Sequence, residues 1–458
     1  MKSISRLAIC IKSIKIVPRL KGNSCSREEP ITNHSLTHTT ERARVVITGM
    51  GAITPIGHTP EEFWRNLLAG KSGIDHVTLF DASNYRTKIA AEVKQFDATK
   101  YNIDTKDVRR MGRATLFALA AAKDALSDAG LGDSLNEDER AGVVLGTGLG
   151  GFVEAIKEHD AFARQGTGRV SPFLAALILP NMPAFFVAHH YRARGFNSTV
   201  VTTCAASTDA IGSATEAIRR GVADVMLAGG TDAIISDIIF TAFGAMRALS
   251  TRNDDPAHAC RPFDKNRDGL VIGEGSAILV LEKLEHALER GAKIYAEVLG
   301  YASNSDPYHF VASDPQAIGA TQVIRNGLKD AGISPDQIDY INAHGTATQL
   351  NDPAETLAIK NVFGERAYRI PISSSKSMLG HAMGAAGTFE AMACALSIRD
   401  QKIHPTISYS APDPECDLDY VPNVARDAQV TIAMSNSFGF GGQNASLVLT
   451  KYDPAESH

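Results

Sequence analysis

Cysteine is scarce in this chain of 458 residues. The six cysteines are scattered, at Cys10, Cys25, Cys204, Cys260, Cys394 and Cys416. None forms a CxxC pair, and no group of histidines and cysteines has the spacing of a structural zinc site, so no metal is expected. A large chain with so few cysteines is typical of a reduced, intracellular protein, which excludes a disulfide scaffold.

Long hydrophobic runs and an excess of basic residues are also missing. The nearest candidate for a membrane span, Phe173 to Ala188, is interrupted by Pro180, Asn181 and Pro183, so a buried or subunit-contact segment is the better interpretation. The formal net charge of -5 argues against a protein built to neutralise nucleic-acid phosphates. We therefore expect a soluble intracellular protein with no membrane span and no nucleic-acid partner.

Acidic residues are missing from the first 27 residues, while Lys and Arg recur there. This composition is typical of an organellar presequence, and a disordered or mis-started extension of a bacterial protein fits it equally well. The expected compartment is accordingly the bacterial cytoplasm, or a mitochondrial or plastid matrix. We expect residues 1–43 to form this extension and the folded part to begin near Arg44.

Strands and helices alternate along the rest of the chain. Runs of β-branched residues that end in glycines, at residues 44–51 and 141–148, predict buried strands. A helix is expected after Thr59, a suitable N-cap followed by Pro60, and another over residues 113–129. The alternation predicts an α/β protein with covered sheets.

The pattern then recurs in the second part of the chain. Each part contains a strand that delivers a reactive-looking residue into a turn rich in Gly, Ser and Thr. We therefore predict a duplicated architecture, with halves at residues 44–292 and 293–452, although the two show no obvious sequence repeat.

Cys204 stands where the β-branched run from Val200 stops and small residues open a helix. A thiol at a helix N-terminus has its thiolate stabilised by the dipole and the free N–H groups, which favours a nucleophile. A buried cysteine alone is more often inert packing, and a lone histidine is usually structural. His344, Lys376 and His381 also lie at turns rich in glycine or serine, and the set of four argues for chemistry.

These motifs resemble those of the β-ketoacyl-(acyl carrier protein) synthases of dissociated fatty acid synthesis, in the elongating synthase I/II branch. The resemblance runs from RVVITGMGAITPIG to NSFGFGGQNASLVLT and includes RALSTRNDDPAHACRPFDKNRDGLVIGEG, NAHGTAT and KSMLGHAMGAAG. It implies the thiolase-like fold, in which two similar α/β halves form five layers in the order α-β-α-β-α.

The resemblance also implies a reaction. Cys204 would attack an acyl-carrier thioester and hold the acyl chain, with the N–H groups of Cys204 and Phe440 as the oxyanion hole. His344 and His381 would assist the decarboxylation of malonyl-carrier by stabilising the enolate. The enolate carbon would then attack the acyl-enzyme and give a 3-oxoacyl-carrier.

Supporting roles follow from the same resemblance. Lys376 would act electrostatically and structurally, Glu355 would hold the network in place, and Phe440 would be a gate whose flanking glycines allow it to swing. The partner would be an acyl carrier protein, whose phosphopantetheine arrives with the substrate, so no organic cofactor is needed. A homodimer is implied, with an acyl tunnel near the dimer contact, and residues 173–186 are our candidate for its lining.

Two positions depart from the family pattern. Thr203 stands where an alanine or another small residue usually precedes the cysteine, and Gln349 stands where HGTxTP usually has proline. Neither replaces a catalytic group, so the departures concern substrate fit and not the class of reaction.

Two motifs suggest other ligands. Residues 146–151 fit GxGxxG, but no strand ending in an acid follows about twenty positions later, as a dinucleotide site requires. Asp264, Asn266 and Asp268 imitate a calcium loop whose twelfth position is Gly275 instead of an acid.

The sequence argues against some related functions and leaves others open. A degradative thiolase would carry a second reactive cysteine where this chain has NSFGFGG, and initiating synthases have Asn where this chain has His381. A chain-length-factor subunit would lack the cysteine. A polyketide ketosynthase shares the chemistry, so fatty acid and type II polyketide pathways both stay open, as does the acyl chain length.

Overall fold

The structure is a computed structural model that describes residues 42–454. The predicted presequence falls almost entirely outside these residues and stays a prediction. No helix within the described range is long and apolar enough to cross a membrane.

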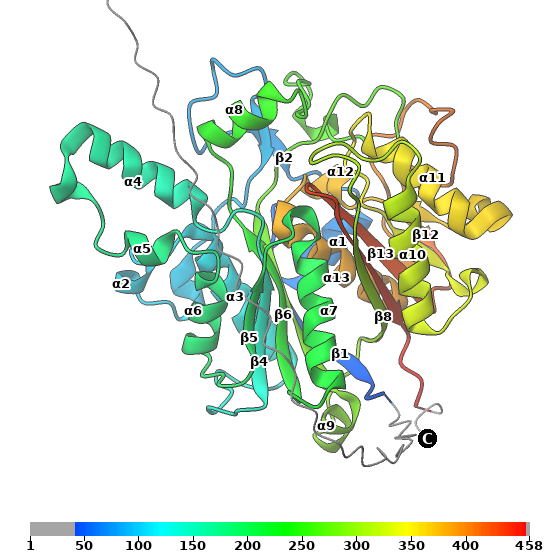
Figure 1. The fold of residues 1–458 in the computed structure, drawn as a ribbon, viewed down its shortest axis with the longest axis horizontal. Helices are drawn as coiled ribbons and strands as arrows, with labels where there is room; N and C mark the ends of the chain where they lie inside the picture. Colours follow the sequence, from blue (N-terminus) through cyan, green and yellow to red (C-terminus); the bar gives the residue numbers. More distant parts are fainter. Residues whose placement is uncertain (1–41, 455–458) are drawn as a thin grey trace, which may run out of the picture. The chain divides into compact units, whose positions relative to one another are not determined.

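Ten strands form one continuous hydrogen-bonded sheet (Figure 1). They are β1 (Val45–Ile53), β4 (Ala141–Gly146), β5 (Asn197–Val200), β6 (Val225–Asp232), β7 (Gly275–Lys283), β8 (Ala296–Ser305), β9 (Tyr340–Asn342), β10 (Ile372–Ser373), β13 (Ile432–Gly439) and β14 (Gln443–Thr450). Two small sheets pair β2 (Ile74–His76) with β3 (Ile89–Ala91) and β11 (Lys402–Ile403) with β12 (Arg426–Asp427).

The large sheet is a repeat of one five-stranded pattern. Its order is β10-β9-β13-β14-β8-β1-β7-β6-β4-β5. The sheet consists of two blocks of five strands, and in each block the strands can be numbered one to five along the chain. Counted from the outer edge of the sheet, both blocks then have the order 3-2-4-5-1, as β10-β9-β13-β14-β8 and β5-β4-β6-β7-β1. The first three strands in that order are parallel, and the last two pairings are antiparallel. The blocks meet where β1 pairs briefly with β8.

Thirteen α-helices cover and separate the two blocks within the described range. They are α1 (Pro60–Leu68), α2 (Thr105–Val108), α3 (Arg113–Asp128), α4 (Phe152–Gln165), α5 (Leu174–Leu177), α6 (Met182–His190), α7 (Ala206–Arg219), α8 (Asp237–Ala245), α9 (Leu284–Glu289), α10 (Ile318–Ala331), α11 (Asn351–Phe363), α12 (Lys376–Leu379) and α13 (Ala386–Asp400).

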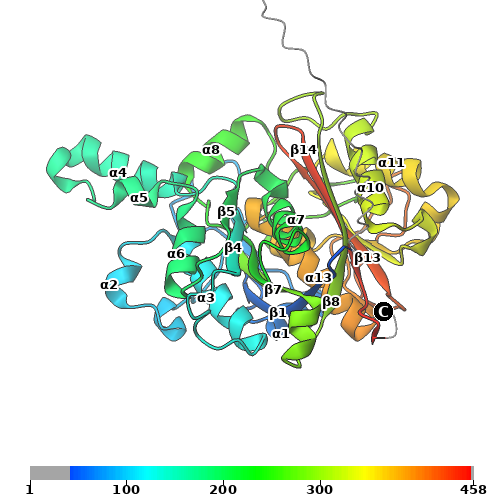
Figure 2. The same cartoon turned by 60° about the horizontal axis from the view of Figure 1, so that its bottom comes forward.

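Two helices, α7 and α13, form the central layer. Helix α7 packs on β4 and β6 of one block and on β8 and β14 of the other, and α13 likewise contacts strands of both blocks (Figure 2). Helices α3 and α6 cover the outer face of the first block, and α10 that of the second. The predicted α-β-α-β-α layering and α/β class are therefore confirmed.

Local sequence signals explain several elements. Thr59 caps α1 by accepting the Glu62 N–H through its side chain, and Pro60 occupies the first turn, as expected. Strand β1 does not stop at Gly51, as expected, but continues through its glycines to Ile53. Side chains at Gly49 and Gly51 would overlap the backbone of α3, so glycine at these positions lets the helix lie close to the strand. The glycines here allow close packing and do not form a loop.

Residues 173–186 do not line the cavity beside Cys204 within the single chain. Phe173 and Phe185 are 42% and 46% exposed, and α5, which belongs to this segment, projects away from the sheet together with α4 (Figure 2). A tunnel lined by this segment at a dimer contact stays a prediction.

Candidate active site

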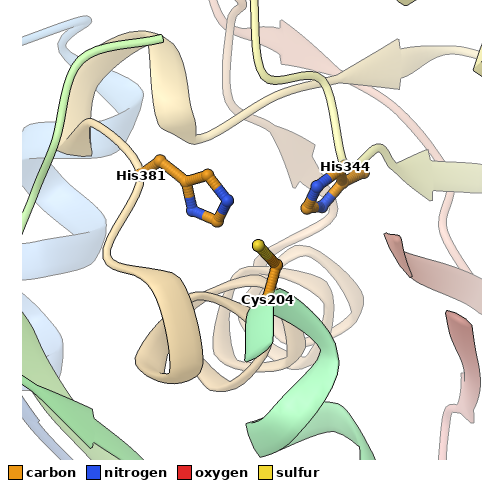
Figure 3. A group of neighbouring side chains, drawn as sticks. All are labelled: Cys204, His344 and His381. Carbon is orange, nitrogen blue, oxygen red and sulfur yellow. The ribbon is translucent and has the colours of Figure 1, made fainter. Parts of the chain in front are cut away.

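Cys204, His344 and His381 come from separate segments and meet in one place (Figure 3). Cys204 lies in the short 3-10 helix η3 (Thr203–Ala205) between β5 and α7. His344 follows β9, and His381 precedes the 3-10 helix η7 (Met383–Ala385). The sulfur and one nitrogen of each ring lie within 4.8 Å of one another, and all three side chains are buried. The two blocks thus contribute side chains to a single buried cluster.

Hydrogen bonds fix the protonation pattern of the two histidines. His381 Nδ1 accepts the Met383 N–H at 3.2 Å, and His344 Nδ1 lies 3.4 Å from Lys376 Nζ. Because both Nδ1 atoms face donors, the ring proton of each neutral histidine belongs on Nε2. Burial, followed by the charge of Lys376, lowers the pKa of both rings well below the usual value, so both are neutral hydrogen-bond donors at pH 7.

The thiol of Cys204 is less acidic than the sequence suggested. Burial raises its pKa to about 11, and Lys376, the Phe440 N–H and the Thr203 hydroxyl offset this only in part. Helix α7 begins at Ala206, two residues beyond the sulfur, which limits the dipole effect that we expected at Cys204. The resting residue is therefore a protonated thiol.

Lys376 is a buried cation whose partner the sequence analysis missed. Its ammonium group forms an ion pair with Glu390 on α13, and both side chains are at most 2% exposed. Burial raises the pKa of Glu390 to about 7, against the opposing effect of Lys376. The available signal was a lone acid within the apolar helix AGTFEAMACALSI, since a buried acid requires a partner.

Glu355 supports the turn that carries His344. Its carboxylate on α11 accepts the backbone N–H groups of His344 and Gly345, both at 2.8 Å. Burial nevertheless raises the pKa of Glu355 to about 7. Glu355 therefore holds the backbone turn from which the His344 ring projects.

Asp232, at the end of β6, is a second residue that the sequence analysis missed. It accepts hydrogen bonds from Gly148 N at 2.7 Å, Gly384 N at 2.6 Å and the Thr147 hydroxyl at 2.8 Å. It therefore ties the GxGxxG turn to the segment after His381. This use of the turn's donors argues against phosphate binding there.

The calcium-like segment has its acids occupied as well. Asp264 accepts the N–H groups of Ser410 and Ala411, and Asp268 accepts the Ser250 hydroxyl and the Thr251 N–H. These carboxylates hold loops together.

Phe440 lies in the turn between β13 and β14. Its N–H is one of the groups that lower the pKa of Cys204 against the effect of burial, and its ring stacks on Phe243 with centroids 6.1 Å apart. Gly441 and Gly442 follow with φ angles of +83° and +71°, which glycine adopts without strain.

A cavity of about 250 Å³ opens above these residues. Its walls include the catalytic candidates and apolar side chains such as Phe243, Leu270 and Met383. The lining also includes Arg247, His309, Met246 and Leu350. The side chains of Met246 and Leu350 are exposed to solvent. A mainly apolar pocket with a few convergent polar groups is typical of a ligand site.

Comparison with known proteins agrees with this geometry. Residues 42–287 match the family Beta-ketoacyl synthase, N-terminal domain, and residues 295–410 match Beta-ketoacyl synthase, C-terminal domain. The chain is 49% identical over 413 residues to 3-oxoacyl-[acyl-carrier-protein] synthase 2 of Synechocystis sp., covering 90% of this chain and 99% of that protein. It is 47% identical over 413 residues to the synthase of that name from Staphylococcus aureus, with the same coverage.

Solved structures give the same result. A type II polyketide acyl-carrier protein in complex with its ketosynthase matches with a TM-score of 0.83 and 37% identity, over 90% of this chain and all of that one. A beta-ketoacyl synthase from Burkholderia phymatum matches with a TM-score of 0.82 and 36% identity, with equal coverage. The chain belongs to the beta-ketoacyl synthase family.

Proposed function

We propose that this protein is a 3-oxoacyl-(acyl carrier protein) synthase that elongates fatty acyl chains by decarboxylative Claisen condensation. The observation that carries the proposal is the meeting of one thiol and two neutral histidines beside a buried lysine, at the base of an apolar cavity. A nucleophile and two hydrogen-bond donors at one point suit acyl transfer followed by enolate formation.

The first step transfers the acyl group to Cys204. The sulfur forms a bond to the thioester carbon, the carbon–sulfur bond to the carrier breaks, and the thiol proton ends on the released carrier thiol. The N–H groups of Phe440 and Cys204 stabilise the oxyanion in this proposal, and the Phe440 N–H already lowers the pKa of Cys204. Lys376 stabilises the transient thiolate by its charge.

The second step uses malonyl-carrier. Loss of CO2 leaves an enolate whose oxygen accepts the Nε2–H groups of His344 and His381. Its carbon attacks the acyl carbonyl, the 3-oxoacyl-carrier departs, and Cys204 takes up a proton. Neutral histidines suit this step because each donates a hydrogen bond without giving up its proton beforehand.

An acyl carrier protein is the proposed partner. One structural relative is a ketosynthase in complex with such a carrier. A phosphopantetheine arm brings a phosphate to the cavity mouth, and Arg247 lines that cavity. Arginine binds phosphate through paired N–H donors, so Arg247 is the proposed contact for the arm.

We also propose that the protein is a homodimer. Strand β5 is an edge of the large sheet and has no neighbouring strand on its outer side. The chain segments before and after β5 carry several exposed apolar side chains. They are Phe152, Phe162, Phe173, Ile178, Leu179, Phe185, Phe196 and Val201. An unpaired edge and exposed apolar groups are both features that a second copy would cover.

Polyketide synthesis is the second candidate, since one of the similar structures is the ketosynthase of a type II polyketide system and another is a ketosynthase/chain length factor. The fatty acid reading has the stronger support, because the relatives named 3-oxoacyl-[acyl-carrier-protein] synthase 2 are 46–49% identical and these structures are 37–39% identical. Incubation with excess malonyl-carrier separates the two. A fatty acid enzyme releases one 3-oxoacyl product, and a polyketide enzyme extends it repeatedly.

Intact-protein mass spectrometry with acyl-carrier tests the proposed nucleophile. The natural protein should gain the mass of one acyl group, and Cys204→Ala should gain none. Cys260→Ala is the matched control, because Cys260 is also a buried thiol. Its replacement should leave the adduct unchanged. An adduct that survives in folded Cys204→Ala would contradict the assignment.

A further inference from the structure

Asp232 is a buried carboxylate that holds backbone groups from both blocks. It ends β6, and its side chain is 0% exposed. Oδ2 accepts the N–H of Gly148 at 2.7 Å and the N–H of Gly384 at 2.6 Å, and Oδ1 accepts the Thr147 hydroxyl at 2.8 Å. One oxygen atom thus joins the turn after β4, in the first block, to η7 in the second.

Two glycines make this close approach possible. A side-chain carbon at Gly384 would lie 2.6 Å from Asp232 Oδ2 and 2.4 Å from the Gly148 nitrogen. A side-chain carbon at Gly148 would lie 3.0 Å from the same oxygen. Gly148 belongs to the GxGxxG motif, which in a dinucleotide site leaves its N–H groups for a phosphate. Here the motif binds an internal carboxylate instead.

The negative charge makes this contact strong. Burial raises the pKa of Asp232 to about 6, so the carboxylate is ionised at pH 7. A hydrogen bond from an N–H to a carboxylate is stronger than one to a neutral acceptor. Burial of the charge costs free energy that a neutral residue at this place would avoid. The charge therefore adds a firm hold on Gly384.

The residue before Gly384 contacts His381. The Met383 N–H donates to His381 Nδ1 at 3.2 Å. The His381 backbone is already fixed, since its N–H donates to the Val271 carbonyl at 2.7 Å and its carbonyl accepts the Gly273 N–H at 2.9 Å. The ring is the part that can still turn, and the Met383 N–H determines its orientation and its tautomer.

Met383 links the two contacts through a strained conformation. Its φ is +48°, which a residue with a side chain keeps only where its surroundings hold it. The backbone hydrogen bonds that form η7 and its end use the N–H groups of Ala385 and Ala386. The N–H groups of Met383 and Gly384 donate to the imidazole and to the carboxylate instead. The carboxylate therefore holds the peptide next to the one that meets the ring.

We propose that Asp232 is a positioning residue that keeps the proton of the His381 ring on Nε2. Asp232 fixes Gly384, Met383 keeps its N–H directed at Nδ1, and Nδ1 stays without a proton. When the carboxylate is lost, Met383 relaxes, the ring proton also occupies Nδ1, and Nε2 loses its donor. The inference rests on the proposed function, in which this donor stabilises the enolate.

The tautomer of His381 tests the proposal without any carrier. In protein with isotope-labelled histidine, the ring nitrogens of the Nε2–H and Nδ1–H forms differ in chemical shift, and the signals that vanish in His381→Ala identify His381. We expect the Nε2–H form in the natural protein and a mixture of both forms in Asp232→Asn. Asp264→Asn is the matched control, because Asp264 is also a buried carboxylate that accepts backbone N–H groups, those of residues 410 and 411. It should leave the tautomer unchanged.

The two reaction steps give a second readout. Asp232→Asn should slow CO2 release from malonyl-carrier on the acyl-enzyme about thirtyfold, as misplacement of a reacting group does. It should change the rate of acyl-adduct formation at Cys204 far less, and Asp264→Asn should slow neither step. If Asp232→Asn does not fold, Thr147→Val, which removes only the hydroxyl donor to Asp232, should shift both readouts in the same direction by a smaller amount.

A His381 ring that stays in the Nε2–H form in folded Asp232→Asn would overturn the proposal. So would CO2 release that is as fast in Asp232→Asn as in Asp264→Asn. Failure of the proposed function gives a different result, since the natural protein would then release no CO2 while the difference in tautomer between the variants would persist.

Discussion

Lys376 and Glu390 form a buried ion pair, and Lys376 Nζ lies 3.4 Å from His344 Nδ1. Removal of one partner leaves the other charge buried alone, which costs about 3–5 kcal/mol, whereas an apolar replacement of both costs much less. The pair is therefore expected to matter for catalysis more than for folding.

The first prediction separates these roles. Glu390→Ala should lower the free energy of unfolding by about 3 kcal/mol. The double variant Lys376→Met with Glu390→Met should recover most of that loss and still release CO2 from malonyl-carrier roughly a hundredfold more slowly, because the His344 ring loses its donor. Urea unfolding and CO2 release provide the two readouts. A fully active double variant would contradict the role of Lys376.

The second prediction concerns His404, which is buried outside the reaction centre. Its Nδ1 donates to the Pro405 carbonyl at 3.0 Å, its Nε2 lies 3.1 Å from the Tyr340 hydroxyl, and burial lowers its pKa to about 4. The unfolded state binds a proton near pH 6.5 and the folded state does not. The contribution of His404 to the free energy of unfolding is therefore fully present above pH 6.5. It decreases by roughly 3 kcal/mol as the pH falls from 6.5 toward 4.

His404→Gln should remove this contribution. Its free energy of unfolding should fall less steeply than that of the natural protein between pH 7 and 4. His159→Gln is the control, since the His159 side chain is 71% exposed. Parallel curves for the natural protein and His404→Gln would show that His404 keeps an ordinary pKa.

At the scale of elements, close approaches between backbones position Cys204, the proposed nucleophile. Strand β4 ends at Gly146, where a side chain would overlap the backbone of Ala206 and Ser207 in the first turn of α7. Because Ala206 lies two residues after Cys204, a shift of α7 moves the sulfur.

The third prediction follows from this contact. Gly146→Ala should cost about 1–3 kcal/mol of stability, as overpacking does, and should slow acylation of Cys204 more than the stability loss explains. Gly244→Ala, in α8 with no atom within 4 Å of the added carbon, should leave both unchanged or stabilise slightly. Melting temperature and acyl-adduct rate give the comparison. Equal behaviour of the two variants would refute the role of Gly146.

Local signals in the sequence predicted these elements well where the cause was local. The Thr59 cap, the helix over residues 113–129 and the turn before Cys204 all depend on neighbours within a few positions. The partners Glu390 and Asp232 were missed because their roles depend on contacts between distant segments. The high pKa of Cys204 was missed for a similar reason, since burial is a property of the assembled fold.

At the scale of the whole molecule, the duplicated pattern of strands places Cys204, the proposed nucleophile, on one block and both histidines on the other. The centre is therefore complete only when the blocks pack together. Sequence motifs pointed to the duplication, and the single continuous sheet, joined through β1 and β8, became visible only in the structure.

The fourth prediction concerns the proposed dimer. Phe185→Asp places a charge on an exposed apolar side chain of α6 and should weaken dimerisation about thirtyfold or more, as loss of an interface hot spot does. Val424→Asp, at an exposed residue in the loop before β12, should not. Sedimentation equilibrium measures both dissociation constants. An unchanged constant for Phe185→Asp would remove that face from the interface.

The most direct test of the account is the fate of isolated acyl-enzyme after addition of malonyl-carrier. The account predicts that the acyl mass on Cys204 disappears as CO2 and a 3-oxoacyl-carrier appear in equal amounts, and that replacing His344 or His381 by alanine leaves the adduct in place. Release of free acid without a 3-oxoacyl-carrier, from a folded protein, would contradict condensation as its function.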